Sequence, residues 1–162
     1  MKPNPLRVLL AVRHSPPAYK GGAEWRARRT AVGLAKRDHR VRVLTVESIT
    51  QGDRCSIQYR DSIDDGIPVR RLSFNLEQAP EAVRWEFRNP LVARNLKSTL
   101  ETFRPHVLHI ISGYLLSGSV VEVAREMGVP VVLTLTDFWF VCPRIILLRP
   151  GGENCMVPEN AL

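Results

Sequence analysis

Residues 7–46 read RVLLAVRHSPPAYKGGAEWRARRTAVGLAKRDHRVRVLTV, with an apolar run at each end and a helical pattern between them. The runs at 7–12 and 41–46 are dominated by aliphatic residues, which is typical of strands buried on both faces of a parallel sheet. Over 23–37, alanine and leucine recur every three or four residues, as on the buried face of a helix. The sequence therefore predicts a strand–helix–strand unit with a right-handed crossover.

The same alternation of strands and helices continues along the rest of the chain. Spacings of this kind predict an α/β domain built on a doubly wound, mostly parallel sheet with helices on both faces. Further strands are predicted at 67–72, 106–111 and 130–135, and further helical segments at 81–103 and 116–127.

Proline and glycine mark the breaks between these elements. Asn89-Pro90 should divide the segment 81–103 into two helices or kink it, because proline cannot continue the backbone hydrogen bonds of a helix. Gly128 stands where a glycine is expected just past the end of a helix. Residues 51–66 are polar and should be irregular, and Pro68 should place its strand at an edge of the sheet.

The composition excludes several classes of protein. The chain has 162 residues, 44% of them hydrophobic, which suffices for one domain with a buried core. It contains no apolar run near the roughly 20 residues of a membrane span, and the run 7–12 is too short for the core of a signal peptide. Three cysteines do not make a disulfide framework. We therefore expect a cytoplasmic protein with reduced thiols.

The charge balance points to phosphate-bearing partners. Lysine and arginine number 23 against 16 acidic residues, which gives a net charge of +7. Nucleic acid, anionic lipid and nucleotides all fit such a surplus, although many of these arginines belong equally well to a solvated surface. The chain lacks helix-turn-helix, zinc-finger and RNA-recognition signatures, so a nucleic-acid partner is not expected.

The first candidate site lies in the loop after the first strand, because open α/β sheets bind ligands beyond the carboxyl ends of their strands. Gly21 and Gly22 lead into a helix, where the backbone can approach a phosphate closely and free N–H groups point at it. The alternative is an ordinary flexible turn. The spacing matches neither a dinucleotide-binding G-x-G-x-x-G nor a P-loop.

Two further loops carry polar and aromatic candidates. Thr136 and Asp137 follow the last predicted strand, where a carboxylate can bond sugar hydroxyls or act as a base, and Trp139 can stack on a sugar ring. The alternative is that Asp137 caps a helix and the aromatic residues belong to the core. His109 reaches the cleft or is a core histidine, and Tyr114 follows it in a turn of unassigned use.

Together these segments resemble the N-terminal domain of family-four glycosyltransferases, which are retaining enzymes of GT-B architecture. The likeness covers nearly the whole chain in the same order. It is carried by GGAE (21–24), LAKRDH (34–39), VRVLT (41–45), DGIPVRRL (65–72), PHVLH (105–109), GVPVVLTLTDFW (128–139), CPR (142–144), LLRPG (147–151) and Cys155.

The resemblance implies a Rossmann-like domain, spanning 1–162, that forms the acceptor side of a two-domain enzyme. The enzyme would transfer a sugar from a UDP- or GDP-sugar to a glycan or lipid-linked acceptor, with no metal or other cofactor. Gly21 and Gly22 would approach the donor diphosphate, while Thr136 and Asp137 would face the transferred sugar. The C-terminal domain that binds the nucleotide sugar is expected to be absent from this chain, which should be inactive alone.

Two positions depart from the family pattern. Thr136 stands where the family usually has a histidine that contacts the donor sugar, and Ile111 stands where a second histidine is common. A threonine hydroxyl can form a hydrogen bond but cannot carry a charge. The departures therefore leave a second hypothesis open, a non-catalytic sugar- or nucleotide-binding module.

Two further hypotheses concern the cysteines and the surface. Cys142 and Cys155 are either free thiols or part of a structural zinc site, which needs four nitrogen or sulfur ligands. The segment 84–88 reads RWEFR, a basic and aromatic mixture that suits docking to an anionic membrane. Such a protein would sit peripherally at the inner face of the cytoplasmic membrane.

Overall fold

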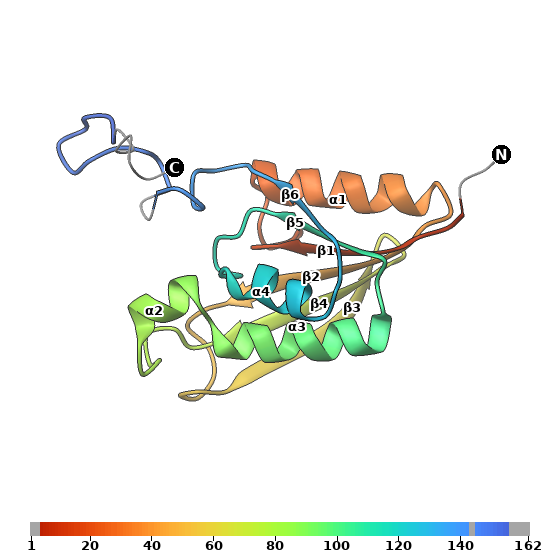
Figure 1. Cartoon of the computed structure of the whole chain (residues 1–162), viewed down its shortest axis with the longest axis horizontal. Coiled ribbons are helices and arrows are strands. Elements are labelled where there is room, and N and C mark those ends of the chain that lie inside the picture. The colour runs from red at the N-terminus through yellow and green to blue at the C-terminus, as the bar shows by residue number, and fades with distance from the viewer. Residues whose placement is uncertain (1–3, 143–144, 156–162) are drawn as a thin grey trace.

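The computed structural model describes residues 4–142 and 145–155, which form six strands and four helices (Figure 1). Every strand and helix predicted from the sequence is present, and one strand was not expected. The elements are β1 (Arg7–Val12), α1 (Gly22–Ala35), β2 (Arg40–Ser48), β3 (Ile57–Asp64), β4 (Ile67–Phe74), α2 (Ala82–Phe87), α3 (Pro90–Phe103), β5 (Val107–Ile111), α4 (Ser119–Glu126) and β6 (Val131–Thr134).

The strands form one sheet in the order β3-β4-β2-β1-β5-β6. All neighbours are parallel except β3 and β4, which are antiparallel. The chain adds strands on one side of β1 as far as β3, and then crosses to the other side to form β5 and β6. The order thus reverses between β1 and β5, which confirms the doubly wound α/β fold.

Helices cover both faces of the sheet, as Figure 1 shows. On one face α1 packs through Ala23, Ala27 and Ala31 against aliphatic side chains of β1, β2 and β4. On the opposite face α2, α3 and α4 pack on a second apolar cluster centred on residues such as Leu9 and Leu44.

The expectation of an irregular segment at 51–66 is wrong, because residues 57–64 form β3. The reason is the turn that follows. Asp65 and Gly66 have φ angles of 50° and 77°, as the two central residues of a type I′ hairpin require, and they join β3 to β4. Pro68 is consequently not in an edge strand, since β3 lies outside β4. Proline is tolerated there because pairing between β4 and β2 begins only at Val69.

The break at Asn89-Pro90 is confirmed and has a specific cap. Asn89 Oδ1 accepts hydrogen bonds from the backbone N–H groups of Leu91 (2.9 Å) and Val92 (3.2 Å). Pro90 occupies the first helical position, where its missing N–H is not needed. Gly128, with φ of 67°, follows α4 as predicted.

Replacing Asn89 by alanine should lower the free energy of unfolding by about 1–2 kcal/mol, since loss of a capping side chain costs about 0.5–2 kcal/mol and Asn89 is only 1% exposed. Urea denaturation followed by circular dichroism measures this change. Asn89→Asp keeps an acceptor oxygen and should lose less. Equal stability of the alanine variant and the wild type would contradict the capping role.

Candidate functional site

The carboxyl ends of β1, β5 and β6 lie side by side at one edge of the sheet. Val12 is paired with Ile111, and Ile111 with Thr134, so the loops that follow these three strands emerge together. The first two loops flank the point where the strand order reverses. This is the edge at which open α/β sheets bind ligands, and Gly21, Thr136 and Asp137 lie in the loops that leave it.

The helix α1 begins at this edge without a capping side chain. Gly21 is its N-cap residue in an extended conformation, with φ of −77° and ψ of 177°, and it makes no side-chain capping bond. Gly21 and Gly22 are exposed. The first N–H groups of a helix have no partner within the helix, so this terminus offers donors and a favourable dipole to an anion.

Arg13 and Glu24 form an ion pair beside this helix terminus, and sequence reasoning did not find it. Arg13 Nε donates to Glu24 Oε1 at 2.9 Å. The Glu24 side chain is only 2% exposed, and its Oε2 has no hydrogen-bond partner. Removing one member of a buried pair leaves an uncompensated charge, so Arg13 and Glu24 depend on each other.

Glu24 also explains why Gly21 is glycine. A Cβ at Gly21 would lie 2.4 Å from Glu24 Oε2, closer than any real contact. A side chain at position 21 would therefore force the buried Glu24 carboxylate to move, whereas the backbone angles of Gly21 place no such demand on the residue. A glutamate three residues after the N-cap is a recognisable sequence signal, as is an arginine placed directly after a buried strand.

The guanidinium of Arg13 lies next to the open helix terminus. Its Nη2 is 3.8 Å from the position that a Cβ on Gly21 would take, and its Cζ is 5.9 Å from the centre of the Tyr114 ring. Only Nε is engaged by Glu24, and a guanidinium has five donors in a rigid fork. The arrangement suits an anionic group such as a phosphate near Gly21, because Arg13 compensates the charge of Glu24 and still has donors to offer.

Asp137 is held in place by the loop that follows β5. Its Oδ2 accepts a hydrogen bond from Ser112 Oγ at 2.5 Å, and its Oδ1 accepts one from the backbone N–H of Trp139 at 3.1 Å. Ser112 is buried and has a φ of 63°, a strained conformation of a kind that clusters at functional sites. Thr136, which precedes Asp137 in the chain, is exposed. The carboxylate is thus oriented at the ligand-binding edge.

Trp139 is packed inside the protein. Its side chain is 7% exposed, it stacks on Phe87 with ring centres 6.0 Å apart, and a Cβ on Gly113 would lie 2.6 Å from its ring. This packing favours the core alternative for Trp139 over stacking on a sugar. It also assigns Gly113 a role that the sequence did not reveal, because any side chain there would collide with the indole. Phe138 and Phe140 remain partly exposed.

His109 and His14 are both partly buried and bonded to the protein. His109 Nε2 lies 2.8 Å from Thr134 Oγ1, and His14 Nδ1 donates to the Val46 carbonyl at 2.7 Å. Burial lowers the pKa of His109. Burial also lowers the pKa of His14, although its bond to Val46 opposes the effect. Both imidazoles are therefore mainly neutral at neutral pH, which suits hydrogen bonding more than charge stabilisation.

Of the three cysteines, Cys142 is buried, Cys155 is half-buried and Cys55 is exposed. Across residues 4–142 and 145–155, no three histidine, cysteine or acidic side chains are grouped as metal ligands would be. Pro143 and Arg144, which belong to the CPR segment of the resemblance, lie outside the described residues.

The segment 84–88 presents less to a membrane than its sequence suggested. Trp85 is buried, while Arg84 pairs with Glu81 at 3.0 Å and Arg88 pairs with Glu122 at 3.1 Å. In the part of the chain that the structure describes, no helix is both long enough and apolar enough to cross a membrane.

Comparison with known protein families identifies the relationship of the chain. The family described as glycosyl transferase 4-like domain matches residues 21–152, which include Gly21, Glu24, Ser112 and Asp137. A search of curated proteins found nothing that matches the chain.

Replacing Gly21 by alanine should lower the free energy of unfolding by about 1–3 kcal/mol, because the new methyl group meets Glu24 Oε2 and forces the side chain off its position. Gly22→Ala is the matched control. A Cβ there meets nothing within 4 Å, so its stability should stay within about 0.5 kcal/mol of the wild type. Urea denaturation of both variants measures the difference.

A double-mutant cycle identifies the cause. In a Glu24→Ala background the cost of Gly21→Ala should largely disappear, because the colliding carboxylate is gone. An equal cost in both backgrounds would show that Gly21 is required for another reason.

Proposed function

The chain belongs to the family of glycosyl transferase 4-like domains, and on this premise we propose that it forms the acceptor side of a retaining glycosyltransferase. The enzyme takes a sugar from a nucleotide-sugar donor and attaches it to a glycan or lipid-linked acceptor. The bond between the anomeric carbon and the donor diphosphate breaks, and an acceptor oxygen takes its place on the same face of the sugar.

The observation that carries this proposal is the grouping of two kinds of site at one edge of the sheet. The open terminus of α1 and the Arg13 guanidinium offer an anion site after β1. Asp137, oriented by Ser112, offers a carboxylate after β6. A diphosphate leaving group and a hydroxylated sugar need these two kinds of partner side by side.

In this proposal the donor diphosphate lies against Gly21 and Gly22, with Arg13 as an additional partner from the same loop. Negative charge develops on the diphosphate as the sugar leaves, and donors fixed in advance stabilise it at little cost of rearrangement. The donor nucleotide is uridine or guanosine diphosphate, and the proposal includes no metal or other cofactor.

Asp137 and Thr136 face the transferred sugar in the same proposal. Both oxygens of Asp137 are already hydrogen-bonded, so its carboxylate is restrained to accept further bonds from sugar hydroxyls at its remaining lone pairs. The exposed Thr136 supplies one neutral hydroxyl. Tyr114 lies beside Arg13, and His109 is bonded to Thr134 at the end of β6.

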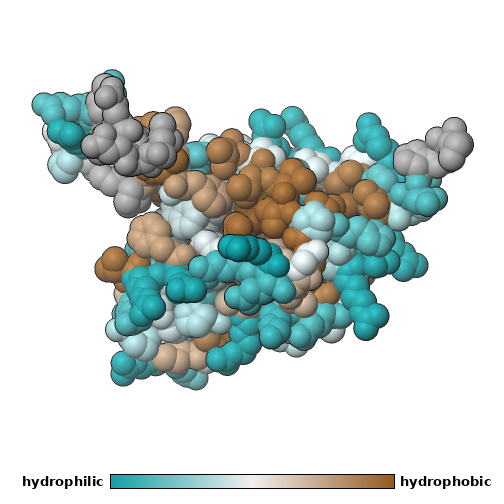
Figure 2. All heavy atoms as spheres, in the orientation of Figure 1, coloured by the Kyte–Doolittle hydropathy of each residue, from teal (hydrophilic) through white to brown (hydrophobic). Residues whose placement is uncertain are grey.

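A second unit that binds the nucleotide sugar completes the cleft in this proposal, and the surface supports such packing. Figure 2 shows apolar side chains gathered over β5, β6 and the start of the segment that follows. Contiguous exposed apolar patches of this kind mark interaction sites. The exposed apolar residues of β6 and the start of the segment after it are Val132, Leu133, Leu135 and Phe138.

The acceptor side of the proposal includes a peripheral contact with an anionic membrane at the inner face of the cytoplasmic membrane, where a lipid-linked acceptor would be presented. Since Trp85 is buried and both Arg84 and Arg88 are paired, the attraction would be electrostatic and would come from the basic surface as a whole. Such attraction weakens as salt is added.

The test compares this chain with the polypeptide encoded by its complete reading frame. The chain alone should release no nucleoside diphosphate from UDP- or GDP-sugars, whereas the complete protein should transfer the sugar, with the retained anomeric configuration visible by NMR. In the complete protein Asp137→Asn should lower kcat/KM by about 10- to 100-fold, because hydrogen bonds to a charged group contribute about 1.5–3 kcal/mol. Glu101→Gln, at an exposed position near the C-terminal end of α3, is the matched control.

Three outcomes would contradict the proposal. Turnover by the 162-residue chain alone would show that no second unit is needed. Inversion of the anomeric configuration would exclude the retaining reaction. Sugar or nucleotide binding without transfer by the complete protein would favour the non-catalytic module.

A further inference from the structure

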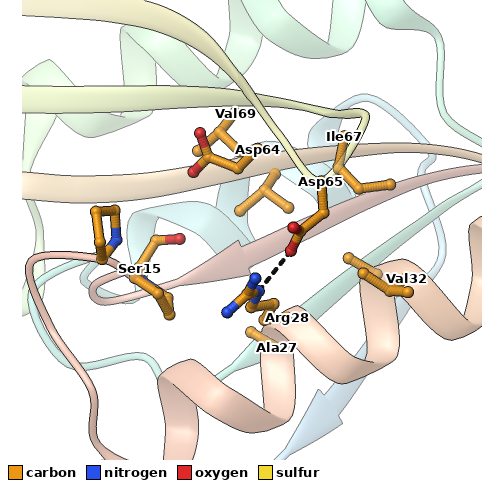
Figure 3. Close-up of a pocket in the computed structure, with 12 residues that line it drawn as sticks. Ser15, Ala27, Arg28, Val32, Asp64, Asp65, Ile67 and Val69 are labelled. Carbon is orange, nitrogen blue, oxygen red and sulfur yellow. Dashed lines mark hydrogen bonds and ion pairs between the residues drawn. The ribbon is translucent and has the colours of Figure 1, made fainter.

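A separate cavity of about 180 Å³ lies between α1 and the strands β2 and β4. Figure 3 shows it bounded by the β1–α1 loop on one side, by α1 on another and by the β3–β4 turn. It does not include the residues placed at the ligand-binding edge. Ser15, Pro16 and Pro17 line it, however, and they belong to the same loop that carries Arg13 and Gly21.

The floor and walls of this cavity are aliphatic. Ala27, Ala31 and Val32 come from α1, and Val43 and Val69 come from neighbouring positions on β2 and β4. Alanine at two positions of the helix leaves the space that larger side chains would fill. A ligand must therefore offer an apolar surface to this floor.

Charged and polar groups surround the mouth. Arg28 Nε donates to Asp65 Oδ2 at 2.6 Å, which joins α1 to the β3–β4 turn across the opening (Figure 3). Arg28 and Asp65 are 40% and 43% exposed, so both remain accessible to a ligand. Asp64 stands nearby and accepts a bond from Arg71 at 2.5 Å. The Ser15 hydroxyl is directed toward the cavity from the opposite side.

The charges at the mouth balance. Each of the two carboxylates is paired with its own arginine, Asp65 with Arg28 and Asp64 with Arg71. The hydrogen bond from Arg28 also lowers the pKa of Asp65, so this pair stays ionised at neutral pH. A phosphate or a carboxylate would meet two negative charges here, and a cation would meet two positive ones. The ligand that fits is neutral and rich in hydroxyl groups.

We propose that this cavity binds a single neutral sugar ring, as a second carbohydrate site beyond the transfer site. Drug-sized ligands occupy pockets of roughly 300–1,000 Å³, so about 180 Å³ suits one ring. The C–H face of a pyranose lies on Ala27, Ala31 and the valines. Its hydroxyls donate to the aspartates and accept from Arg28. The proposal stands on the cavity itself and does not require that the chain take part in transfer.

Binding here also acts on the β1–α1 loop. Arg71 Nη2 donates to the Pro16 carbonyl at 3.0 Å, and the buried Arg71 side chain is at the same time bonded to Asp64 and Ser62. Arg71 thus links Asp64, which lines the cavity, to the backbone of the β1–α1 loop through one set of hydrogen bonds. A bound sugar would reinforce the position of the loop that carries Arg13 and Gly21.

The test is a titration of the ¹⁵N-labelled chain with methyl α-glucopyranoside, methyl α-mannopyranoside and methyl α-galactopyranoside, followed by amide chemical shifts. At least one should cause saturable shifts at amides around Ala31, Gly66 and Val69. Cyclohexanol, which has a ring of the same size with one hydroxyl, should bind at least 10-fold more weakly than that pyranoside.

Two variants locate the site. Ala31→Leu fills the cavity and should weaken binding of that pyranoside at least 10-fold. Asp65→Asn keeps a residue that tolerates the left-handed turn but removes the charge, and should also weaken it at least 10-fold. Asp61→Asn is the control. It removes the carboxylate of a different ion pair in the same hairpin, the one between Asp61 and Arg70, and should leave binding of the pyranoside unchanged. If Ala31→Leu does not fold, the comparison of Asp65→Asn with Asp61→Asn still decides the test.

Several results would overturn the proposal. Absence of saturable shifts with all three pyranosides, up to concentrations that reveal millimolar affinity, would exclude the site. Chemical shifts that persist in Ala31→Leu and Asp65→Asn would also exclude the site. Tighter binding of cyclohexanol than of any pyranoside would indicate a purely apolar cavity and would likewise overturn the proposal. None of these results bears on the transfer reaction, which the complete protein tests separately.

Discussion

The central position of β1 determines where everything else in the molecule lies. It is paired with β2 on one side and with β5 on the other, and its residues are buried on both faces. Because the strand order reverses beside it, the loop after β1 and the loop after β5 leave the sheet at adjacent points. Arg13 and Ser112 are the first residues beyond those two strands, so two side chains far apart in sequence meet at one edge.

Periodic apolar patterns made most of the fold predictable, and the exception shows what such patterns miss. The residues of β3 are mostly exposed, so burial imposes no regular alternation on their sequence. Only the Asp65-Gly66 turn signals this strand, through positive φ angles that few other residue pairs adopt. The candidate site was also predictable only in part. Loop positions follow from topology, but the burial of Trp139 and the pairing of Arg13 with Glu24 depend on tertiary packing.

Arginine serves both sites as a fixed partner of a carboxylate. Arg13 holds the buried Glu24 beside the helix terminus, and Arg28 and Arg71 hold the two aspartates at the mouth of the cavity. The planar guanidinium can make one such bond and still present other donors, which lysine does less well. Part of the arginine surplus is therefore structural, and it does not by itself indicate a polyanionic partner. The proposed phosphate site depends on local geometry and not on the net charge of +7.

The anchoring of the β1–α1 loop bears on the two interpretations of its glycines. Arg13 accepts a bond from Val46 N at 3.0 Å through its carbonyl, and the Tyr19 hydroxyl donates to the Glu47 carbonyl at 3.3 Å. Arg71 holds the Pro16 carbonyl, and His14 is stacked on Tyr19 with ring centres 3.7 Å apart. These contacts hold residues 13–19, so they favour an ordered loop ahead of the two glycines. A Cβ at position 21 would meet the Glu24 carboxylate, so glycine keeps the first turn of α1 open, and donors held in this way would need little rearrangement when an anion binds.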